Sequence, residues 1–194
     1  MSRMSQTEIE LKFPLTSPEE TKRRLLELGF SSQGTVFELN IVFDTPQLKL
    51  ASGDCLLRLR RDRKVKLTFK EPPSEADRSP RFKVKSESEL ELGDFETMRH
   101  ILHKLGFTRE RVYEKYREHF TRGPQVSAEI DQLPHMGFFL ELEAGPGEIE
   151  AVSAALGLDP EQGLRQNYFQ LFDEYCRKTG FQDADMRFAD ETRE

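Results

Sequence analysis

The chain has 194 residues, enough for one sizeable domain, and 36% of them are hydrophobic, which is enough to build a core. Charged residues make up 33%, but the net charge of −6 argues against general binding of nucleic acid while permitting a local basic pocket. No apolar run approaches the roughly 20 residues that a membrane helix needs, and the two cysteines lack CxxC spacing, as expected in a reducing cytosol. We therefore expect a cytoplasmic protein that does not associate with membranes.

The first predicted strand, residues 8–12, alternates charged and aliphatic side chains. Successive side chains of a strand point to opposite faces, so Glu8, Glu10 and Lys12 share one face. Nearly every later strand repeats the pattern with Lys, Arg, Glu or Asp on its polar face. Ordinary solvated sheet faces are one interpretation. We favour a shared barrel interior, in which acids and bases partly satisfy one another and the remainder bind metal ions and a polyanion.

Alternation and turn residues predict eight strands and four helices in chain order. The expected strands are residues 8–12, 37–43, 54–61, 64–70, 81–92, 109–121, 125–133 and 138–143. The expected helices are residues 18–28, 95–105, 148–156 and 164–178. Ser17 is expected to cap the first helix through a capping box, and Asp94 to cap the second.

Three further segments carry expectations of their own. Residues 71–79 contain two prolines and several charges, which predicts a mobile loop at the mouth of the enclosed space. The last helix has an apolar face, which we expect to pack against the outside of the sheet. Residues 1–180 are expected to form one domain, followed by an acidic, aperiodic and frayed tail at 181–194.

The charged residues indicate a chemistry without reference to any known protein. Carboxylates without clustered Cys or His select hard cations, so the implied metal is Mg²⁺ or Mn²⁺. Basic residues on several strands would surround a polyphosphate, and no GxxxxGK[ST] loop is present to hold it by backbone amides. These bases are Arg58, Arg60, Lys70, Lys115 and Arg117.

Several motifs occur together in an order that matches a known family. The first is Glu8-Ile9-Glu10-Leu11-Lys12, an ExExK sequence. Those that follow are Phe43-Asp44-Thr45-Pro46, Leu57-Arg58-Leu59-Arg60, Leu67-Thr68-Phe69-Lys70, Lys85-x-Glu87-x-Glu89, Lys115-x-Arg117, Glu129-Ile130-Asp131 and Leu140-Glu141-Leu142-Glu143. Over residues 7–178 the chain resembles the CYTH superfamily, or triphosphate tunnel metalloenzymes, which includes class IV adenylate cyclases, thiamine triphosphatases and inorganic triphosphatases.

The resemblance implies an α+β fold: an eight-stranded antiparallel closed β-barrel, forming a tunnel, with helices packed outside. It implies metal binding by Glu8, Glu10, Asp131, Glu141 and Glu143, and catalytic roles for Glu8, Glu10 and Lys12. It implies triphosphate binding by Lys12, Arg58, Arg60, Lys70, Lys85, Lys115 and Arg117. Glu87 and Glu89 fit the family's acidic strand, whereas Val42 stands where many members have Tyr.

Three functions follow as alternatives. The first is a metal-dependent triphosphatase that removes the terminal phosphate of a small or inorganic triphosphate, such as tripolyphosphate, thiamine triphosphate or a nucleoside triphosphate. The second is a class IV adenylate cyclase, which converts ATP to cyclic AMP and pyrophosphate. The third is a polyphosphate-binding module without turnover. All three predict a triphosphate-bearing small molecule as the partner, and they leave open whether the protein is a monomer or a homodimer.

Overall fold

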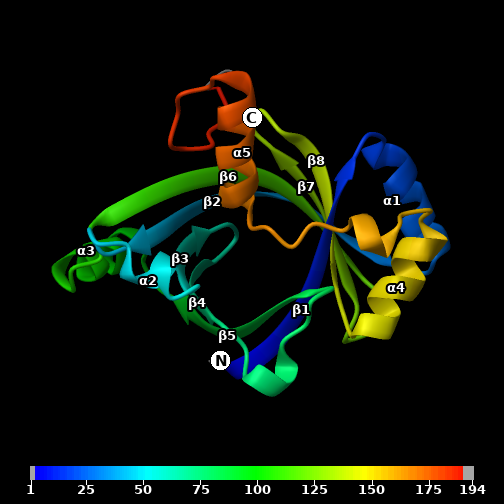
Figure 1. Cartoon of the computed structure of the whole chain (residues 1–194), viewed down its shortest axis with the longest axis horizontal. Helices are drawn as coiled ribbons and strands as arrows, with labels where there is room; N and C mark the ends of the chain where they lie inside the picture. Colours follow the sequence, from blue (N-terminus) through cyan, green and yellow to red (C-terminus); the bar gives the residue numbers. More distant parts are fainter. Residues whose placement is uncertain (1–2, 190–194) are drawn as a thin grey trace.

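The structure is a computed structural model that describes residues 3–189. Within that range eight strands close into one antiparallel barrel, in the order β1-β5-β4-β3-β2-β6-β7-β8 (Figure 1). The strands are β1 (Arg3–Leu15), β2 (Ser31–Asp44), β3 (Leu56–Arg61), β4 (Val65–Glu71), β5 (Lys83–Leu92), β6 (Arg109–Thr121), β7 (Ser127–Leu133) and β8 (Gly137–Glu143). The predicted number of strands and the closed α+β barrel are both confirmed.

Five α-helices and two short 3₁₀ turns surround the barrel in the described part of the chain. They are α1 (Pro18–Glu27), α2 (Lys49–Ser52), η1 (Glu75–Asp77), α3 (Phe95–Lys104), α4 (Pro146–Ala155), η2 (Pro160–Gln162) and α5 (Tyr168–Thr179). None of these helices is both long and apolar enough to cross a membrane.

Strand register places the charged residues on a common inner face. On β1, Glu10 lies opposite Lys83 of β5 on one side and opposite Glu143 of β8 on the other. Lys12 lies opposite Glu141 in the same ladder. Because alternate residues face the same way, the charged positions seen in the sequence meet inside one barrel.

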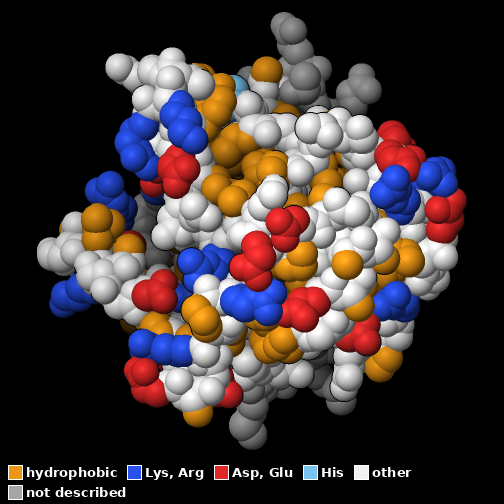
Figure 2. Space-filling model, turned by 45° about the vertical axis from the view of Figure 1, so that its right-hand side comes forward, with side chains coloured by type: hydrophobic (Ala, Val, Ile, Leu, Met, Phe, Trp, Pro, Cys, Tyr) orange, Lys and Arg blue, Asp and Glu red, His pale blue; other side chains and the backbone are white. Residues whose placement is uncertain are grey.

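The apolar residues of the same strands face outward, so the hydrophobic core lies between the barrel wall and the helices. Helices α1 and α4 cover one side, where Leu11 packs with Leu25 and Ile149. Helix α3 covers the opposite side through Phe95 and Leu102 (Figure 1). On the face shown in Figure 2, basic and acidic side chains lie beside one another, without the field of a single sign that nucleic acid favours.

Helix α5 is not where we predicted it. Instead of packing on the outer face of the sheet, Tyr168 and Phe172 pack with Tyr113, Leu133 and Phe139. These three strand residues alternate in step with the inward-facing charges of β6, β7 and β8, so α5 covers one end of the barrel. An apolar helix face predicts burial but does not say which surface buries it.

The segment before α5 also differs from its prediction, because the helix begins at Tyr168 rather than at residue 164. Leu164 instead pairs with β1: the Leu164 and Lys12 backbones exchange hydrogen bonds of 2.7 and 3.1 Å. Asn167 then caps the helix by accepting a hydrogen bond from the Gln170 backbone N–H at 2.9 Å.

We predicted a frayed tail at 181–194, and within residues 181–189 the structure places part of it against the barrel. Met186 is fully buried. Its N–H donates to the Val112 carbonyl at 2.9 Å, and its carbonyl accepts from the Glu114 N–H at 2.8 Å. The tail thereby pairs with the part of β6 that comes before the residues paired with β7. The predicted tail also includes residues 190–194, which lie outside the described residues.

Two local predictions failed at polar residues. The side chain of Ser17 makes no capping hydrogen bond, although α1 still begins at Pro18. After β2 a short helix, α2, was not predicted. It forms because the Asp44 carboxylate accepts hydrogen bonds from the backbone N–H groups of Leu50 and Ala51 at 3.0 and 2.9 Å. Asp94, in contrast, caps α3 as predicted, accepting from the Thr97 N–H at 2.7 Å.

We predict that Gly163→Ala destabilises the protein. A Cβ atom at this position would lie 2.4 Å from side-chain atoms of Leu11, which is fully buried in the core. Overpacking of this kind costs about 1–3 kcal/mol, measurable as a lower free energy of unfolding in urea. Gly147→Ala in α4 is the matched control, since its Cβ would meet nothing within 4 Å. A Gly163→Ala variant as stable as Gly147→Ala would contradict this account.

Candidate functional site

The barrel encloses a cavity of about 640 Å³, which is lined by charged side chains from all eight strands. At one end the lining includes Asn167, Tyr168 and Phe169 of the α5 segment, and at the other Gln33, Gly34 and Arg63. The cavity therefore runs from the α5 end toward the turns that join β3 to β4.

Carboxylates gather on the part of the wall formed by β1, β8 and β7. Glu10 lies opposite Glu143, and Glu129 lies opposite Glu141. Glu143 is partly exposed at the rim, but desolvation of its carboxylate, together with repulsion from Glu8 and Glu129, raises its pKa to about 8. Desolvation and the nearby Glu10 and Glu87 also raise the pKa of Glu8, against the opposing effect of Lys70.

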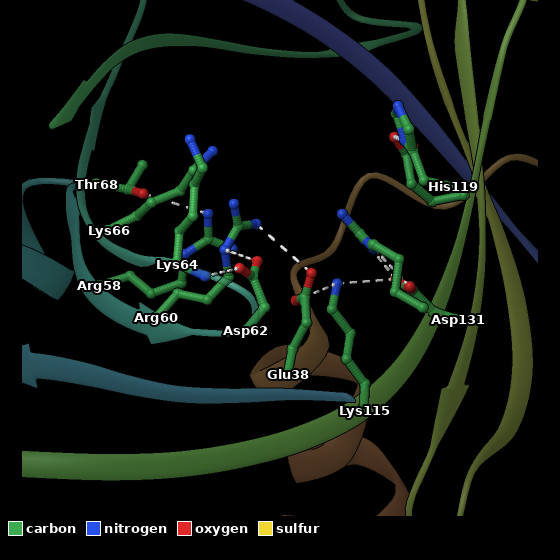
Figure 3. A network of polar contacts seen from close by, with 12 residues as sticks. Glu38, Arg58, Arg60, Asp62, Lys64, Lys66, Thr68, Lys115, His119 and Asp131 are labelled. Atoms are coloured by element: carbon green, nitrogen blue, oxygen red, sulfur yellow. Dashed lines mark hydrogen bonds and ion pairs between the residues drawn. The ribbon is translucent and has the colours of Figure 1, made fainter. Parts of the chain in front are cut away.

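Basic side chains project into the same cavity from β3, β4 and β6. Arg58 and Arg60 come from β3, Lys66 from β4 and Lys115 from β6 (Figure 3). Lys66 lies 2.6 Å from Glu89, and Arg60 lies 3.2 Å from Asp62. Lys115 lies 3.4 Å from Glu38 of β2, which itself is almost fully buried. Acids and bases thus face each other across the cavity as a nearly balanced set.

Lys12 joins the acidic strands. Its ammonium group, almost completely buried, contacts the Glu10 carboxylate and lies 3.0 Å from Glu141. Burial alone would lower the pKa of Lys12, but the two carboxylates raise it above its ordinary value. Glu10 is also 2.7 Å from Lys83, and these cations hold its pKa below the usual range despite its burial. Both Glu10 and Lys12 are therefore ionised at neutral pH.

Asp131, a predicted metal ligand, lies behind the cavity wall and does not line the cavity. It is fully buried and accepts hydrogen bonds from Lys115 at 3.0 Å, from Arg117 Nε at 2.6 Å and from the Tyr168 hydroxyl at 2.7 Å. In this geometry Asp131 orients two of the predicted phosphate-binding bases and ties them to α5. That Asp131 is a metal ligand stays a prediction.

The structure separates Lys85 from the other predicted bases. Its ammonium group is 2.6 Å from both the backbone carbonyl and the carboxylate of Asp54, in the turn before β3, and it does not line the cavity. The other predicted substrate-binding residues do line it: Lys12, Arg58, Arg60, Lys70, Lys115 and Arg117. So do the predicted acids Glu8, Glu10, Glu141 and Glu143, together with Glu87 and Glu89.

Several cavity residues were missing from the predicted site. Glu38, Lys83 and Glu129 lie at inward positions of their strands, so alternation alone places them inside. The family motifs, however, assign them no role. Tyr113 and Tyr168 also line the cavity. No sequence signal distinguished these tyrosines from ordinary core residues, since each also packs in an apolar cluster.

The fit of the carboxylates to a divalent cation is partial. Among residues 3–189, no three potential ligands stand together in a metal-binding arrangement, and Lys12, Lys70 and Lys83 lie against the carboxylates. However, Glu8 and Glu143 have raised pKa values in part because carboxylates crowd them, and a cation relieves such repulsion. An all-oxygen donor set of this kind suits Mg²⁺ or Mn²⁺.

Comparison with known proteins decides the family. The CYTH domain model matches residues 6–162 of the chain. The chain belongs to the CYTH family. Members of this family are enzymes, adenylate cyclases or triphosphatases, that bind triphosphate substrates and use divalent metals. Binding of triphosphates and divalent metals by this family is consistent with the acids and bases that line the cavity.

Individual relatives match this chain over nearly their whole length. A Methanocaldococcus jannaschii protein named "putative adenylate cyclase" is 28% identical over 84% of this chain and 97% of its own. The PH1012 protein of Pyrococcus horikoshii has 27% identity and a TM-score of 0.70, over 84% of this chain and 98% of its own. A Hippeastrum protein, described as a "putative adenylyl cyclase" with a dominant triphosphatase activity, shares the fold at 17% identity and a TM-score of 0.57, over 90% of this chain and 96% of its own.

We predict that Asp131→Asn destabilises the barrel strongly. The change leaves Lys115 and Arg117 without their shared buried carboxylate, and breaking such a buried pair costs about 3–5 kcal/mol. Asp173→Asn is the control, because Asp173 pairs with Arg111 at 2.8 Å on an exposed surface of α5, where pairs contribute about 1 kcal/mol or less. Urea denaturation of both variants measures the difference, and equal losses would show that Asp131 does not organise the site.

Proposed function

We propose that this protein is a metal-dependent triphosphatase that removes the terminal phosphate of a small or inorganic triphosphate. One observation supports the proposal most directly: a single cavity carries a carboxylate wall on β1 and β8 and a basic wall on β3, β4 and β6. A triphosphate matches the bases, and a divalent cation matches the acids.

The basic wall binds and orients the substrate in this proposal. Arg58 and Arg60 offer planar forks that can each bind two phosphate oxygens, while Lys70 and Lys115 act as point charges. Arg117, held by Asp131 at 2.6 Å, is fixed in direction before substrate arrives. Positioning of this kind, together with stabilisation of the charge that develops on the transferred phosphoryl group, supplies most of the catalysis of phosphoryl transfer.

The acidic wall would hold the metal. Glu8, Glu10, Glu141 and Glu143 are the proposed ligands, and Mg²⁺ or Mn²⁺ bound there would offset the charge of the triphosphate and acidify a water molecule. Lys12 lies between Glu10 and Glu141 and keeps both ionised and in place. Without a cation, the same carboxylates would repel a polyanion in the cavity. The proposal therefore requires metal for activity.

A class IV adenylate cyclase is the second candidate. It is favoured by the name of the Methanocaldococcus jannaschii relative, which matches this chain over nearly all of its own length. The same two walls would serve it, with the ribose 3′ hydroxyl of ATP in place of water and with pyrophosphate as the leaving group. A polyphosphate-binding module is the third, and it would have no need of four acids on the wall facing the bases.

Product analysis separates the three. We expect phosphate from tripolyphosphate, ATP or thiamine triphosphate in the presence of Mg²⁺ or Mn²⁺, and no phosphate in EDTA. Cyclic AMP with pyrophosphate from ATP would establish the cyclase instead. Tripolyphosphate that binds yet survives with either metal would establish the binding module.

We predict that Glu10→Gln abolishes turnover without unfolding the barrel. The change removes a proposed metal ligand, so the rate should fall on the order of 100-fold or more. The barrel should stay folded because Lys12 keeps Glu141 as its partner, 3.0 Å away. Lys12→Ala should likewise lose activity, since both Glu10 and Glu141 lose the cation between them.

Steady-state rates and far-ultraviolet circular dichroism check these two variants together. Glu20→Gln on α1 is the control, because Glu20 pairs with Arg23 and Arg24 on the exterior. Near wild-type activity of either cavity variant would refute the assignment of the acidic wall.

A further inference from the structure

Five buried polar side-chain atoms make no hydrogen bond within residues 3–189, and all five lie on two neighbouring strands. They are Glu38 Oε2 and both amide atoms of Asn40 on β2, and the Nε atoms of Arg58 and Arg60 on β3. Buried polar atoms are nearly always satisfied in folded proteins, because desolvation without a partner is costly. Their concentration in one place therefore calls for a functional reason.

Asn40 is at the centre of this group. It lies opposite Arg60 on β3 and opposite Tyr113 on β6, and two residues further along β2, Val42 lies opposite Arg58. Its side chain is fully buried and shares the inward face of β2 with Glu38. The amide therefore lies within the wall between the two arginines of the basic side and Tyr113.

The two arginines differ in how the cavity holds them. Arg58 has no carboxylate within 4.0 Å among the described residues, and its contacts are the Tyr113 hydroxyl at 3.3 Å and the Thr68 hydroxyl at 3.4 Å. Arg60 has three carboxylates at 3.2 to 3.7 Å, one of them Glu38 (Figure 3). Arg58 can therefore turn toward an anion at little loss of existing contacts, whereas Arg60 exchanges ion pairs for it.

We propose that Asn40 is a positioning residue for Arg58 and Arg60, and that it takes up this role when a triphosphate occupies the cavity. The inference rests on the proposed function. Phosphate oxygens draw the outer nitrogens of both arginines into charge-assisted hydrogen bonds. The inner Nε atoms then donate to the carbonyl oxygen of Asn40, which has two lone pairs to accept them. Its amide group donates to Glu38 Oε2, which lies 3.4 Å from Lys115 and makes no hydrogen bond in the unliganded protein.

Complementary hydrogen-bonding capacity supports this arrangement. Neither amide atom of Asn40 nor Arg58 Nε has a partner, whereas Arg60 Nε and Glu38 Oε2 make no hydrogen bond but lie 3.2 Å from Asp62 and 3.4 Å from Lys115. Phosphate accepts but does not donate, so it cannot itself satisfy the Asn40 carbonyl or Glu38 Oε2. Asn40 can, because it links the arginines to Glu38 through both ends of one amide. Tyr113 supports Arg58 from the neighbouring strand through its hydroxyl.

Binding of an imido-bridged tripolyphosphate in Mg²⁺, measured by calorimetry, tests the role without turnover. Asn40→Leu should bind about tenfold more weakly than wild type, the expected loss of a hydrogen bond to a charged group. The thermal midpoint of its unliganded form should be unchanged or raised, because the lost amide has no protein partner there. Val42→Ile, on the same face of β2, is the control and should bind within about twofold of wild type.

Two further variants show whether Asn40 acts through the arginines. In an Arg58→Met, Arg60→Met background the effect of Asn40→Leu on affinity should shrink to about twofold or less, as coupled residues require. Tyr113→Phe keeps the ring and removes only the hydroxyl, and should weaken binding by about threefold. It provides a second test should Asn40→Leu fail to fold.

The outcomes that would overturn the proposal are distinct. If Asn40→Leu lowers the thermal midpoint but binds like Val42→Ile, the amide has a structural role, for example by holding a water molecule. If its loss of affinity persists undiminished without both arginines, it does not act through them. If wild type itself does not bind the analogue, the proposed function falls, whereas wild-type binding with unaltered binding by Asn40→Leu and Tyr113→Phe removes this inference alone.

Discussion

The direction in which β1 faces depends on the pairing of buried opposite charges, with Lys12 between Glu10 and Glu141. A buried ion is tolerated only with a partner, so this side chain fixes which face of β1 points inward. Leu11, on the other face, is fully buried beneath the outer helices. A slip of one residue in register would bury Lys12 in the apolar layer and place Leu11 among the charges, and both errors are costly.

The same charges that fix the register prevent the cavity from collapsing. Acids and bases of nearly equal number line the interior and many of them pair directly, so the interior is close to neutral as a whole. Such an interior gains little from admitting a lone anion or a lone cation. In the proposed function, a triphosphate bound together with a divalent cation matches both kinds of side chain.

How far the sequence predicts this structure depends on whether the deciding contact is local. Alternation along a strand is local, and it correctly places Glu8, Arg58 and Glu141 inside one barrel. The site of α5 is not local, because its apolar face matches both the outer surface and the barrel end. Met186 shows the same limit, since nothing near it in the sequence reveals that it completes β6.

Residues with charged side chains show a similar limit. Lys85 and Asp131 lie at inward positions of their strands and match the family motifs. However, Lys85 pairs with Asp54, and Asp131 pairs with the bases of β6. Glu38 and Asn40 were overlooked for the converse reason: their strand position was predicted, but an unsatisfied amide is visible only when all neighbours are in place. Sequence patterns predict the face of a strand, and packing decides what each side chain contacts.

The pairing of β1 with β8 has a consequence for how the protein is made. Lys12 lies opposite Glu141, so the carboxylate wall joins residues that are 129 positions apart in the chain. Contacts of such long range form late and slow the folding of β proteins. Charged side chains on strands that are not yet paired oppose edge-to-edge association, so the residues that line the cavity also disfavour aggregation before the barrel closes.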